Sequence, residues 1–265
     1  MDQIGLKAYY EEREPTPQNV ADLFKGSWKS LLPGGLASGT SPMFEDRRPA
    51  WLAAQLPGGF TLKSVIEFGP FEGYQTYLML REGAREVTSV EANSINFLKC
   101  LCVKEIYRLS ANFLFGDIVK FLENCERRYD VAWASGMLYH LQDPIYFIQR
   151  VSQIADYVYV WTHHFDAEAI GRLQNGQDKY FIADLDKVEC HHGRKIVLHA
   201  RSYLLPEYKE GIPLYWEGGL EQVTYWLTKE DLLWLFEQAG MHILAVQGEG
   251  DVAGLPCVGF LVGRS

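Results

Sequence analysis

The segment between Val65 and Gly73 combines residue types that could hold a cofactor. It reads Val-Ile-Glu-Phe-Gly-Pro-Phe-Glu-Gly, so a short apolar run leads into a carboxylate and a Gly-x-x-x-Gly turn. A turn that binds a dinucleotide carries three glycines, and the middle one lets backbone N–H groups approach the pyrophosphate. Here Phe71 takes that middle position and Glu72 follows it. The bulky ring argues against a pyrophosphate ligand.

The charge of this turn favours a cationic ligand. The carboxylates of Glu67 and Glu72 would repel a phosphate and attract a positive group. We therefore expect a cofactor that contains adenosine, lacks phosphate and carries positive charge. S-adenosylmethionine, with its sulfonium and its free amino group, meets these three conditions.

Composition and charge narrow the class of protein. The chain has 265 residues, 48% hydrophobic and 22% charged, as in ordinary soluble globular proteins. No apolar stretch reaches the roughly 18 residues of a membrane span, and residues 1–7 lack the features of a signal peptide. We expect no membrane partner and a cytoplasmic location. The net charge of −9 argues against a nucleic-acid partner without excluding a local basic patch.

The cysteines and histidines do not predict a metal site. The five cysteines include no Cys-x-x-Cys pair, so we interpret them as reduced thiols. Histidines form two adjacent pairs, 163–164 and 191–192, with acidic residues nearby. Adjacent histidines point in different directions, and no pair has the helical i, i+4 spacing. We expect solvated loop histidines here and no bound metal.

From residue 62 onward, predicted strands alternate with predicted helices. Strands are expected at residues 64–68, 86–90, 112–115, 129–134 and 156–161, with a final pair at 242–246 and 258–262 joined by a Gly-rich loop. Helices are expected at residues 74–81, from a Ser94 cap with Phe97, Leu98, Leu101 and Leu109 inward, from Pro144, and from a Thr228 cap to Gly240. Such alternation predicts an α/β fold, a parallel sheet with helices on both faces.

Two stretches depart from this alternation. Residues 1–60 are predicted to form an N-terminal helical extension, with one helix capped by Thr16 and another opening at Pro49. Residues 163–226 show no clear period, which predicts an inserted cap within a main domain of residues 61–265. The extension and the cap could roof a pocket or simply pack on the core. The aromatic residues Tyr203, Tyr215, Trp216, Tyr225 and Trp226 could line a substrate pocket or form the core of the cap, and we expect core for most of them.

Small and polar residues follow four successive strands of the predicted sheet. In open parallel sheets, ligands bind beyond the carboxyl ends of the strands, where strand order reverses. Glu91, 18 positions after Gly73, suits a carboxylate that binds both ribose hydroxyls, and Asp117 could accept a hydrogen bond from an adenine amino group. A lone acid at a strand end is often only a helix cap, but four such strand ends in order are more specific. The predicted cofactor-binding residues are Glu67, Gly69, Pro70, Phe71, Gly73, Glu91, Ala92, Gly116, Asp117, Ile118, Ser135, Gly136 and Met137.

These stretches resemble a known family. Residues 66–73, 89–93 and 116–117 look like successive motifs of class I S-adenosylmethionine-dependent methyltransferases. Residues 135–141 (Ser-Gly-Met-Leu-Tyr-His-Leu) are similar to a stretch in bacterial tRNA wobble-uridine transferases and related small-molecule methyltransferases. The resemblance covers residues 62–162 well and 228–263 loosely. It implies a Rossmann-like, seven-stranded sheet whose last strand runs antiparallel. The chain departs from the family at Pro70 and Phe71, where many members have small residues.

Methyl transfer to a hydroxyl or an amine needs an aligned nucleophile and a group that accepts its proton. His140 is the first candidate base, because an imidazole with its ordinary pKa of roughly 6.5 accepts protons near neutrality. Tyr139 could orient the acceptor, and His163 follows the fifth strand, where it could face the same cleft. A structural role for His140, as a hydrogen-bonded residue at a helix start, is an equal alternative.

We therefore predict methyl transfer from S-adenosylmethionine to an oxygen or nitrogen of a small molecule. A tRNA-modifying transferase is the main alternative, because of the Leu-Tyr-His-Leu stretch. An NAD-dependent oxidoreductase is disfavoured by Phe71 and Glu72. A member of the fold that binds the cofactor without catalysis is a further alternative. The sequence predicts neither the acceptor nor the oligomeric state.

Overall fold

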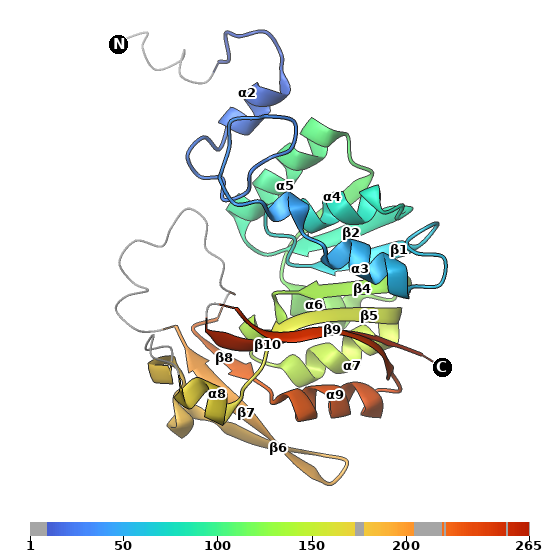
Figure 1. The fold of residues 1–265 in the computed structure, drawn as a ribbon, viewed down its shortest axis with the longest axis vertical. Helices are drawn as coiled ribbons and strands as arrows, with labels where there is room; N and C mark the ends of the chain where they lie inside the picture. The colour runs from blue at the N-terminus through green and yellow to red at the C-terminus, as the bar shows by residue number, and fades with distance from the viewer. Residues whose placement is uncertain (1–9, 173–177, 204–218, 220, 253, 265) are drawn as a thin grey trace.

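The computed structural model describes residues 10–172, 178–203, 219, 221–252 and 254–264 (Figure 1). Its centre is a seven-stranded sheet with the order β3-β2-β1-β4-β5-β10-β9. The first five strands run parallel, and β10 pairs antiparallel with both β5 and β9. The strands are β1 (Ser64–Phe68), β2 (Glu86–Glu91), β3 (Ala111–Phe115), β4 (Tyr129–Ser135), β5 (Ala155–His163), β9 (His242–Val252) and β10 (Leu255–Gly263). The predicted fold class is confirmed, and strand order reverses between β1 and β4.

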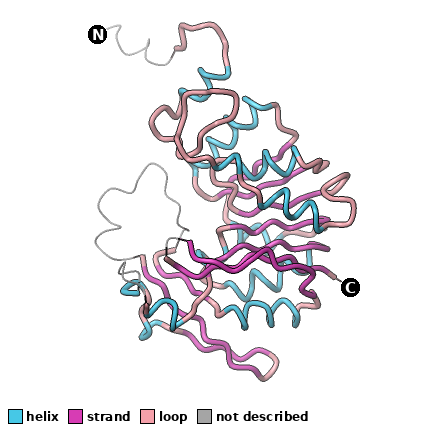
Figure 2. The backbone as a smooth tube through the Cα atoms, in the orientation of Figure 1, coloured by secondary structure: helices cyan, strands magenta, loops and turns pink. Residues whose placement is uncertain are grey.

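Helices cover both faces of this sheet (Figure 2). Successive residues of β4 pack on opposite faces of the sheet. Trp133 packs in one apolar cluster with Leu52 of α3 (Arg48–Gln55), whereas Ala132 and Ala134 pack in another with Val151 of α7 (Pro144–Ile154). Side chains of a strand point alternately to opposite faces, so both faces must be apolar when both are covered. One face carries α3, α4 (Tyr74–Arg81) and α5 (Ser94–Tyr107), and the other carries α6 (Ile118–Asn124), α7 and α9 (Lys229–Gln238).

The predicted helix starts are largely confirmed. Thr16 caps α2 (Pro17–Asp22), and Thr228 caps α9 by accepting a hydrogen bond from the Asp231 N–H. The cap of α5 is one residue earlier than predicted, because the Asn93 side chain rather than Ser94 accepts from the Ile95 and Asn96 N–H groups. Both residue types cap well, so local preference alone did not separate them.

The buried face of α5 differs from the prediction. Leu98 and Leu101, expected inward, are 45% and 38% exposed, whereas Lys99 is fully buried. Lys99 turns inward because its ammonium pairs with the buried carboxylate of Glu72. An ion pair inside the protein has thus replaced part of the expected apolar stripe.

The insertion contains regular structure that the sequence analysis did not anticipate. After α8 (Ala167–Gly171), a three-stranded antiparallel sheet has the order β6-β7-β8. Its strands are β6 (Lys187–His191), β7 (Arg194–Ser202) and β8 (Val223–Trp226). No residue of β6 is buried, so the apolar alternation that signals a strand is absent there. Tyr215 and Trp216 of the predicted cap lie outside the described residues. The division of the chain into an extension of residues 1–60 and a main domain of residues 61–265 stays a prediction.

The last two strands are longer than predicted. The segment expected as a Gly-rich loop belongs to the β9–β10 hairpin, where Glu249 pairs with Val258 and Gly250 pairs with Cys257. Backbone pairing with β10 overrides the weak strand preference of glycine and acidic residues. No helix in the described part of the chain is long and apolar enough to cross a membrane.

Candidate active site

The turn after β1 has the backbone conformation of a glycine-rich ligand loop. Gly69, Phe71 and Gly73 have φ values of 72°, 57° and 78°. Phe71 adopts a left-handed conformation that glycine accepts most easily, and its N–H donates to the Glu91 carboxylate at 3.1 Å. A Cβ atom on Gly69 would lie 3.6 Å from the Cβ of Met137. The loops that follow β1, β2 and β4 therefore meet.

Glu91 connects the first two of these loops. Its carboxylate accepts hydrogen bonds from the N–H groups of Phe71 at 3.1 Å and Asn93 at 2.8 Å. The residue is 7% exposed, and burial raises the pKa of its carboxyl to about 7. A carboxylate offers about four lone-pair sites, so Glu91 keeps acceptor capacity for a ribose hydroxyl.

Glu67 lies at the start of the turn and is fully buried. One of its oxygens accepts hydrogen bonds from the hydroxyls of Thr76 and Ser89, whereas Oε1 has no partner among the described residues. Burial raises the pKa of this carboxyl to about 7. A buried oxygen without a donor costs free energy, so this position suits a ligand with N–H groups. The amino group of S-adenosylmethionine is such a ligand group.

Glu72 does not have the predicted role. Its carboxylate is fully buried, lies 2.7 Å from the Lys99 ammonium, and accepts from the N–H groups of Lys29 and Ser30 at 3.1 and 2.8 Å. Its charge is therefore compensated, and it binds the N-terminal extension. The prediction that Glu72 repels a phosphate is wrong. The Phe71 side chain and the buried Glu67 carboxyl still disfavour a dinucleotide at this turn.

At the end of β3, Asp117 acts as a helix cap. Its Oδ1 accepts a hydrogen bond from the Lys120 N–H at 2.8 Å, at the start of α6, where Ile118 is the first residue. Sequence reasoning missed Phe115, which is 58% exposed and lies 5.2 Å from the ring of Phe97. Exposed aromatic faces beside Gly116 offer a surface on which an adenine ring could stack.

The fourth strand end is joined to the N-terminal extension. Gly136 has a φ of 81° and donates its N–H to the Trp161 carbonyl at 2.9 Å. The hydroxyl of Ser135 accepts a hydrogen bond from Arg48 Nη1 at 2.8 Å. Sequence analysis did not select Arg48, because its only local signal is its position before Pro49.

The structure brings the three predicted catalytic residues together. Tyr139 lies on the short helix η2 (Leu138–His140), and its ring centroid is 4.2 Å from that of His140 and 4.8 Å from that of His163. The His163 ring also stacks on Trp226 at 5.4 Å, with 7° between the ring planes. Because η2 directly follows Met137, this aromatic cluster adjoins the loop after β4.

Both imidazoles of the cluster are neutral near pH 7. Burial, together with the charge of Arg201 and the neighbouring His163, lowers the pKa of His140 to about 3. Burial and Arg201 lower the pKa of His163 to about 4. The expectation of an ordinary pKa for His140 is therefore wrong. His163 Nδ1 lies 3.2 Å from the Pro256 carbonyl, which can only accept, so Nε2 is left as the proton acceptor.

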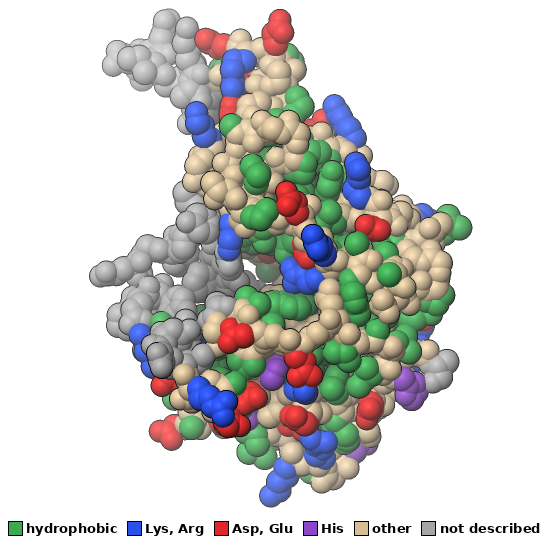
Figure 3. Space-filling view, in the orientation of Figure 1, with side chains coloured by type: hydrophobic (Ala, Val, Ile, Leu, Met, Phe, Trp, Pro, Cys, Tyr) green, Lys and Arg blue, Asp and Glu red, His purple; other side chains and the backbone are tan. Residues whose placement is uncertain are grey.

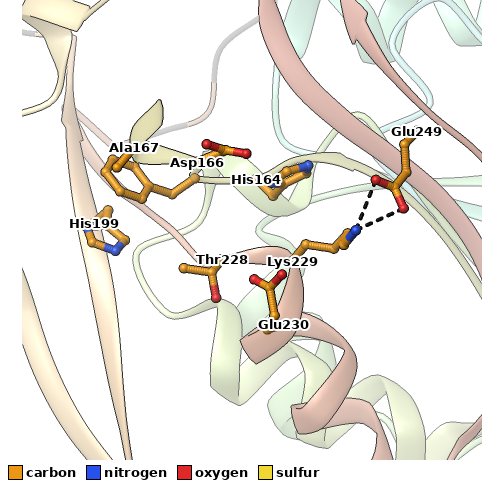
Figure 4. Close-up of a pocket in the computed structure, with 9 residues that line it drawn as sticks. His164, Asp166, Ala167, His199, Thr228, Lys229, Glu230 and Glu249 are labelled. Carbon is orange, nitrogen blue, oxygen red and sulfur yellow. Dashed lines mark hydrogen bonds and ion pairs between the residues drawn. The ribbon is translucent and has the colours of Figure 1, made fainter. Parts of the chain in front are cut away.

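A separate hollow of about 320 Å³ lies at the start of α9 (Figure 4). Lys229 pairs there with Glu249 at 2.9 Å, and His199 stacks on Phe165 at 3.5 Å. His164 lines the hollow, and its buried Nδ1 has no partner among the described residues. None of the predicted site residues lines this hollow, so it is distinct from the aromatic cluster.

No protein-family model matches the chain. Among curated proteins, tRNA U34 carboxymethyltransferase of Alteromonas mediterranea is 28% identical over 95 residues. That match covers 34% of this chain and 28% of the length of the relative. The similarity is therefore partial.

Solved structures match over nearly the whole chain. The N-terminal domain of EvdMO1, crystallised with SAH and D-fucose, has a TM-score of 0.67 and 20% identity and covers 94% of this chain and 95% of its own. The chain has the class I methyltransferase fold. Magnesium protoporphyrin IX methyltransferase (ChlM) of Synechocystis PCC 6803, with bound SAH, has a TM-score of 0.56 and 15% identity, and covers 82% of this chain and 80% of its own. Both additions contact strand ends of this fold, since Arg48 of the extension bonds to Ser135 and Trp226 of the insertion stacks on His163.

Proposed function

We propose that the chain is an S-adenosylmethionine-dependent methyltransferase that acts on an oxygen or nitrogen of a small molecule. The observation that supports this most is the junction of two groups of residues beyond the strand ends. The loops after β1, β2 and β4 meet through the contacts of Glu91 and Met137. The cluster of Tyr139, His140 and His163 follows directly on the last of these loops.

The residues at this junction suit the parts of the cofactor. Glu91 would accept hydrogen bonds from the ribose hydroxyls, and Phe115 would stack on the adenine. Glu67 Oε1 would accept from the amino group of the methionine part. The bound cofactor supplies an electrophilic methyl carbon. Structures of the same fold have been solved with SAH or SAM bound, which supports the choice of cofactor.

The histidine cluster would handle the acceptor proton. When an acceptor O–H or N–H becomes O–CH₃ or N–CH₃, one proton is released. The hydrogen bond from Nδ1 to the Pro256 carbonyl holds His163 in the tautomer whose Nε2 can accept a proton. The His140 ring also contacts Tyr139 and is the second candidate acceptor. Because both pKa values are low, the imidazoles would relay this proton to solvent rather than keep it.

The first test is ligand binding by isothermal titration calorimetry. We expect S-adenosylmethionine and SAH to bind and NADH not to bind. Turnover would then be followed as SAH production over a panel of hydroxyl and amine acceptors, including D-fucose, since the N-terminal domain of EvdMO1 was crystallised in the presence of that sugar. Binding of both cofactors without turnover on any acceptor would favour the non-catalytic alternative. Binding of NADH alone would refute the proposal.

A tRNA substrate is the second candidate, because of the partial match to the tRNA U34 carboxymethyltransferase. Basic and acidic side chains are interspersed over the face drawn in Figure 3, and the net charge is −9. Proteins that bind the phosphate backbone use clusters of Lys and Arg, and their affinity falls steeply with salt. Filter binding of bulk tRNA at two salt concentrations distinguishes the candidates. Salt-dependent binding together with methyl incorporation into tRNA would favour this second function.

A further inference from the structure

The N-terminal extension places a partly buried cation beside the loop after β4. Arg48 is the first residue of α3, and its Nη1 donates to the Ser135 hydroxyl at 2.8 Å. Nη2 lies 3.5 Å from the hydroxyl of Tyr74, the residue that follows the glycine turn. The guanidinium also lies over the ring of Trp161, 5.0 Å from its centroid. Arg48 therefore touches the ends of β4 and β5 and the start of α4.

A hydrogen-bond network holds this guanidinium in place. Asp46 accepts from Arg48 Nε at 2.9 and 3.0 Å and lies 2.7 Å from Nη2. The same carboxylate accepts from Gln75 Nε2 at 2.9 Å, and Gln75 Oε1 accepts from Trp133 Nε1 at 2.8 Å. The Arg48 side chain is 24% exposed and that of Asp46 is 11% exposed. The guanidinium is thus fixed before any ligand arrives, yet part of it remains accessible.

One donor of this fixed group is available to a ligand. A guanidinium has five N–H bonds in a rigid fork. The bonds to Asp46, Ser135 and Tyr74 use four of them, and the second N–H of Nη1 has no acceptor among the described residues. Arginine is the side chain best suited to a carboxylate, because its planar fork matches the carboxylate geometry.

We propose that Arg48 binds the carboxylate at the amino-acid end of S-adenosylmethionine. This inference rests on the proposed function. The methionine part of the cofactor carries an ammonium and a carboxylate, and it must lie beside the Ser135–Met137 loop if the adenosine lies over β2 and β3. Glu67 Oε1, which has no partner in the described part of the chain, then receives the ammonium, and Arg48 receives the carboxylate. The extension thereby belongs to the cofactor site.

The test compares two ligands by calorimetry. SAH carries the amino-acid end, whereas 5′-methylthioadenosine keeps the adenosine and the sulfur but lacks that end. Arg48→Gln should weaken SAH binding by roughly 10- to 100-fold, the range for a hydrogen bond to a charged group. The affinity for 5′-methylthioadenosine should stay within about twofold of the wild-type value, because the adenosine contacts are untouched.

Arg47→Ala is the matched control. Arg47 is the neighbouring residue and is exposed, so its loss removes the same charge without touching Ser135 or Asp46. We expect no change for either ligand. A second probe is SAH without its carboxylate, which wild type should bind more weakly than SAH and which the Arg48→Gln protein should bind as well as SAH.

The outcomes separate this inference from the proposed function. If Arg48→Gln weakens both ligands equally, or weakens neither, Arg48 only fastens α3 to the sheet and the inference is overturned. If the wild-type protein binds neither SAH nor 5′-methylthioadenosine, the proposed function itself fails. Should Arg48→Gln not fold, Arg48→Lys keeps the charge but loses the fork, and the loss for SAH alone is again required.

Discussion

Glu67 and Glu91 bring two buried carboxyl groups into the proposed cofactor site. Burial raises the pKa of each to about 7, so both are partly protonated at neutral pH. A bound ammonium and ribose hydroxyls would favour the ionised forms. Cofactor binding should therefore release protons, and affinity should rise as pH increases through about 7 and level off above it. Calorimetry in two buffers of different ionisation enthalpy measures this release. Affinity that falls with rising pH would contradict it.

Glu91 is the residue for which the cofactor prediction is most direct. Glu91→Ala removes an acceptor of ribose hydroxyls and of the Phe71 N–H, so we expect SAH binding to weaken by about 1.5–3 kcal/mol. Glu86→Ala is the control, because Glu86 lies at the opposite end of β2 and is bonded at the surface by Arg85 and Arg127. Calorimetry should show no change for the control. Unchanged affinity in Glu91→Ala would remove Glu91 from the site.

His140 and His163 predict a distinct pH profile. Their pKa values of about 3 and 4 lie below the ordinary value of 6.5, so both imidazoles stay neutral as pH falls from 8 to 6. We expect kcat to show no loss from these groups over that range. The result that would contradict this is a loss of activity at low pH with a midpoint near 6.5 in the wild type, and no such pH dependence in His163→Gln. It would show that the His163 imidazole has an ordinary pKa in the folded protein.

Removal of the base itself tests the catalytic role. We expect His163→Gln or His140→Ala to lower kcat by roughly 10²–10⁴ while SAH affinity stays unchanged. His192→Ala is the control, because His192 is exposed in the turn between β6 and β7. A near-normal rate in one variant would reduce that histidine to a structural role.

At the scale of elements, the buried pair of Glu72 and Lys99 fastens residues 27–30 to the glycine turn and to α5. Lys99 also donates to the Ser27 carbonyl, and its ammonium lies 5.5 Å from the centre of the Trp28 ring. The pair thus joins the extension to the element that carries Phe71. A cofactor loop held by a long-range ion pair depends on the extension for its shape.

Lys99→Met should destabilise the fold strongly. It leaves the Glu72 carboxylate buried without its counter-charge, which typically costs about 3–5 kcal/mol. The double variant Lys99→Met with Glu72→Gln should lose less than the sum of the single changes. Lys120→Ala breaks an exposed pair with Glu123 and should change the free energy of unfolding by less than about 0.5 kcal/mol. Urea denaturation of wild type, the two single variants, the double variant and Lys120→Ala measures these changes. A Lys99→Met protein as stable as Lys120→Ala would contradict the role of the pair.

At the scale of the whole molecule, a ligand that binds between the strand ends and the extension should stabilise both. SAH at about 100 times its Kd adds about 2.7 kcal/mol, which corresponds to a rise in Tm of roughly 5–10 °C for a chain of this size. A thermal scan with SAH, NADH and no ligand measures this. We expect the rise with SAH only, and an equal rise with NADH would argue for a dinucleotide site.

Local patterns in the sequence were enough to predict the sheet and most helix boundaries, and they also underlie the proposed position of the ligand site. The glycine turn, the caps of α2 and α9 and the polar residues at strand ends are short-range features. Each depends on residues within a few positions of one another, and parallel strands place their carboxyl ends along one edge. Tyr139 and His140 follow β4 and His163 ends β5, so this rule alone predicts that the three residues lie close together.

Only the tertiary structure decided the partners of the buried charges. Glu72 meets Lys99, 27 residues later, and Ser30, 42 residues earlier, while Arg48 meets Ser135 across 87 residues. No local period marks such pairs, because a charged side chain looks the same in sequence whether solvent or a distant ion surrounds it. The same reason explains the low pKa values of His140 and His163, which follow from burial and from Arg201 on another sheet. Sequence determined which groups could do chemistry, and packing determined their charge and their neighbours.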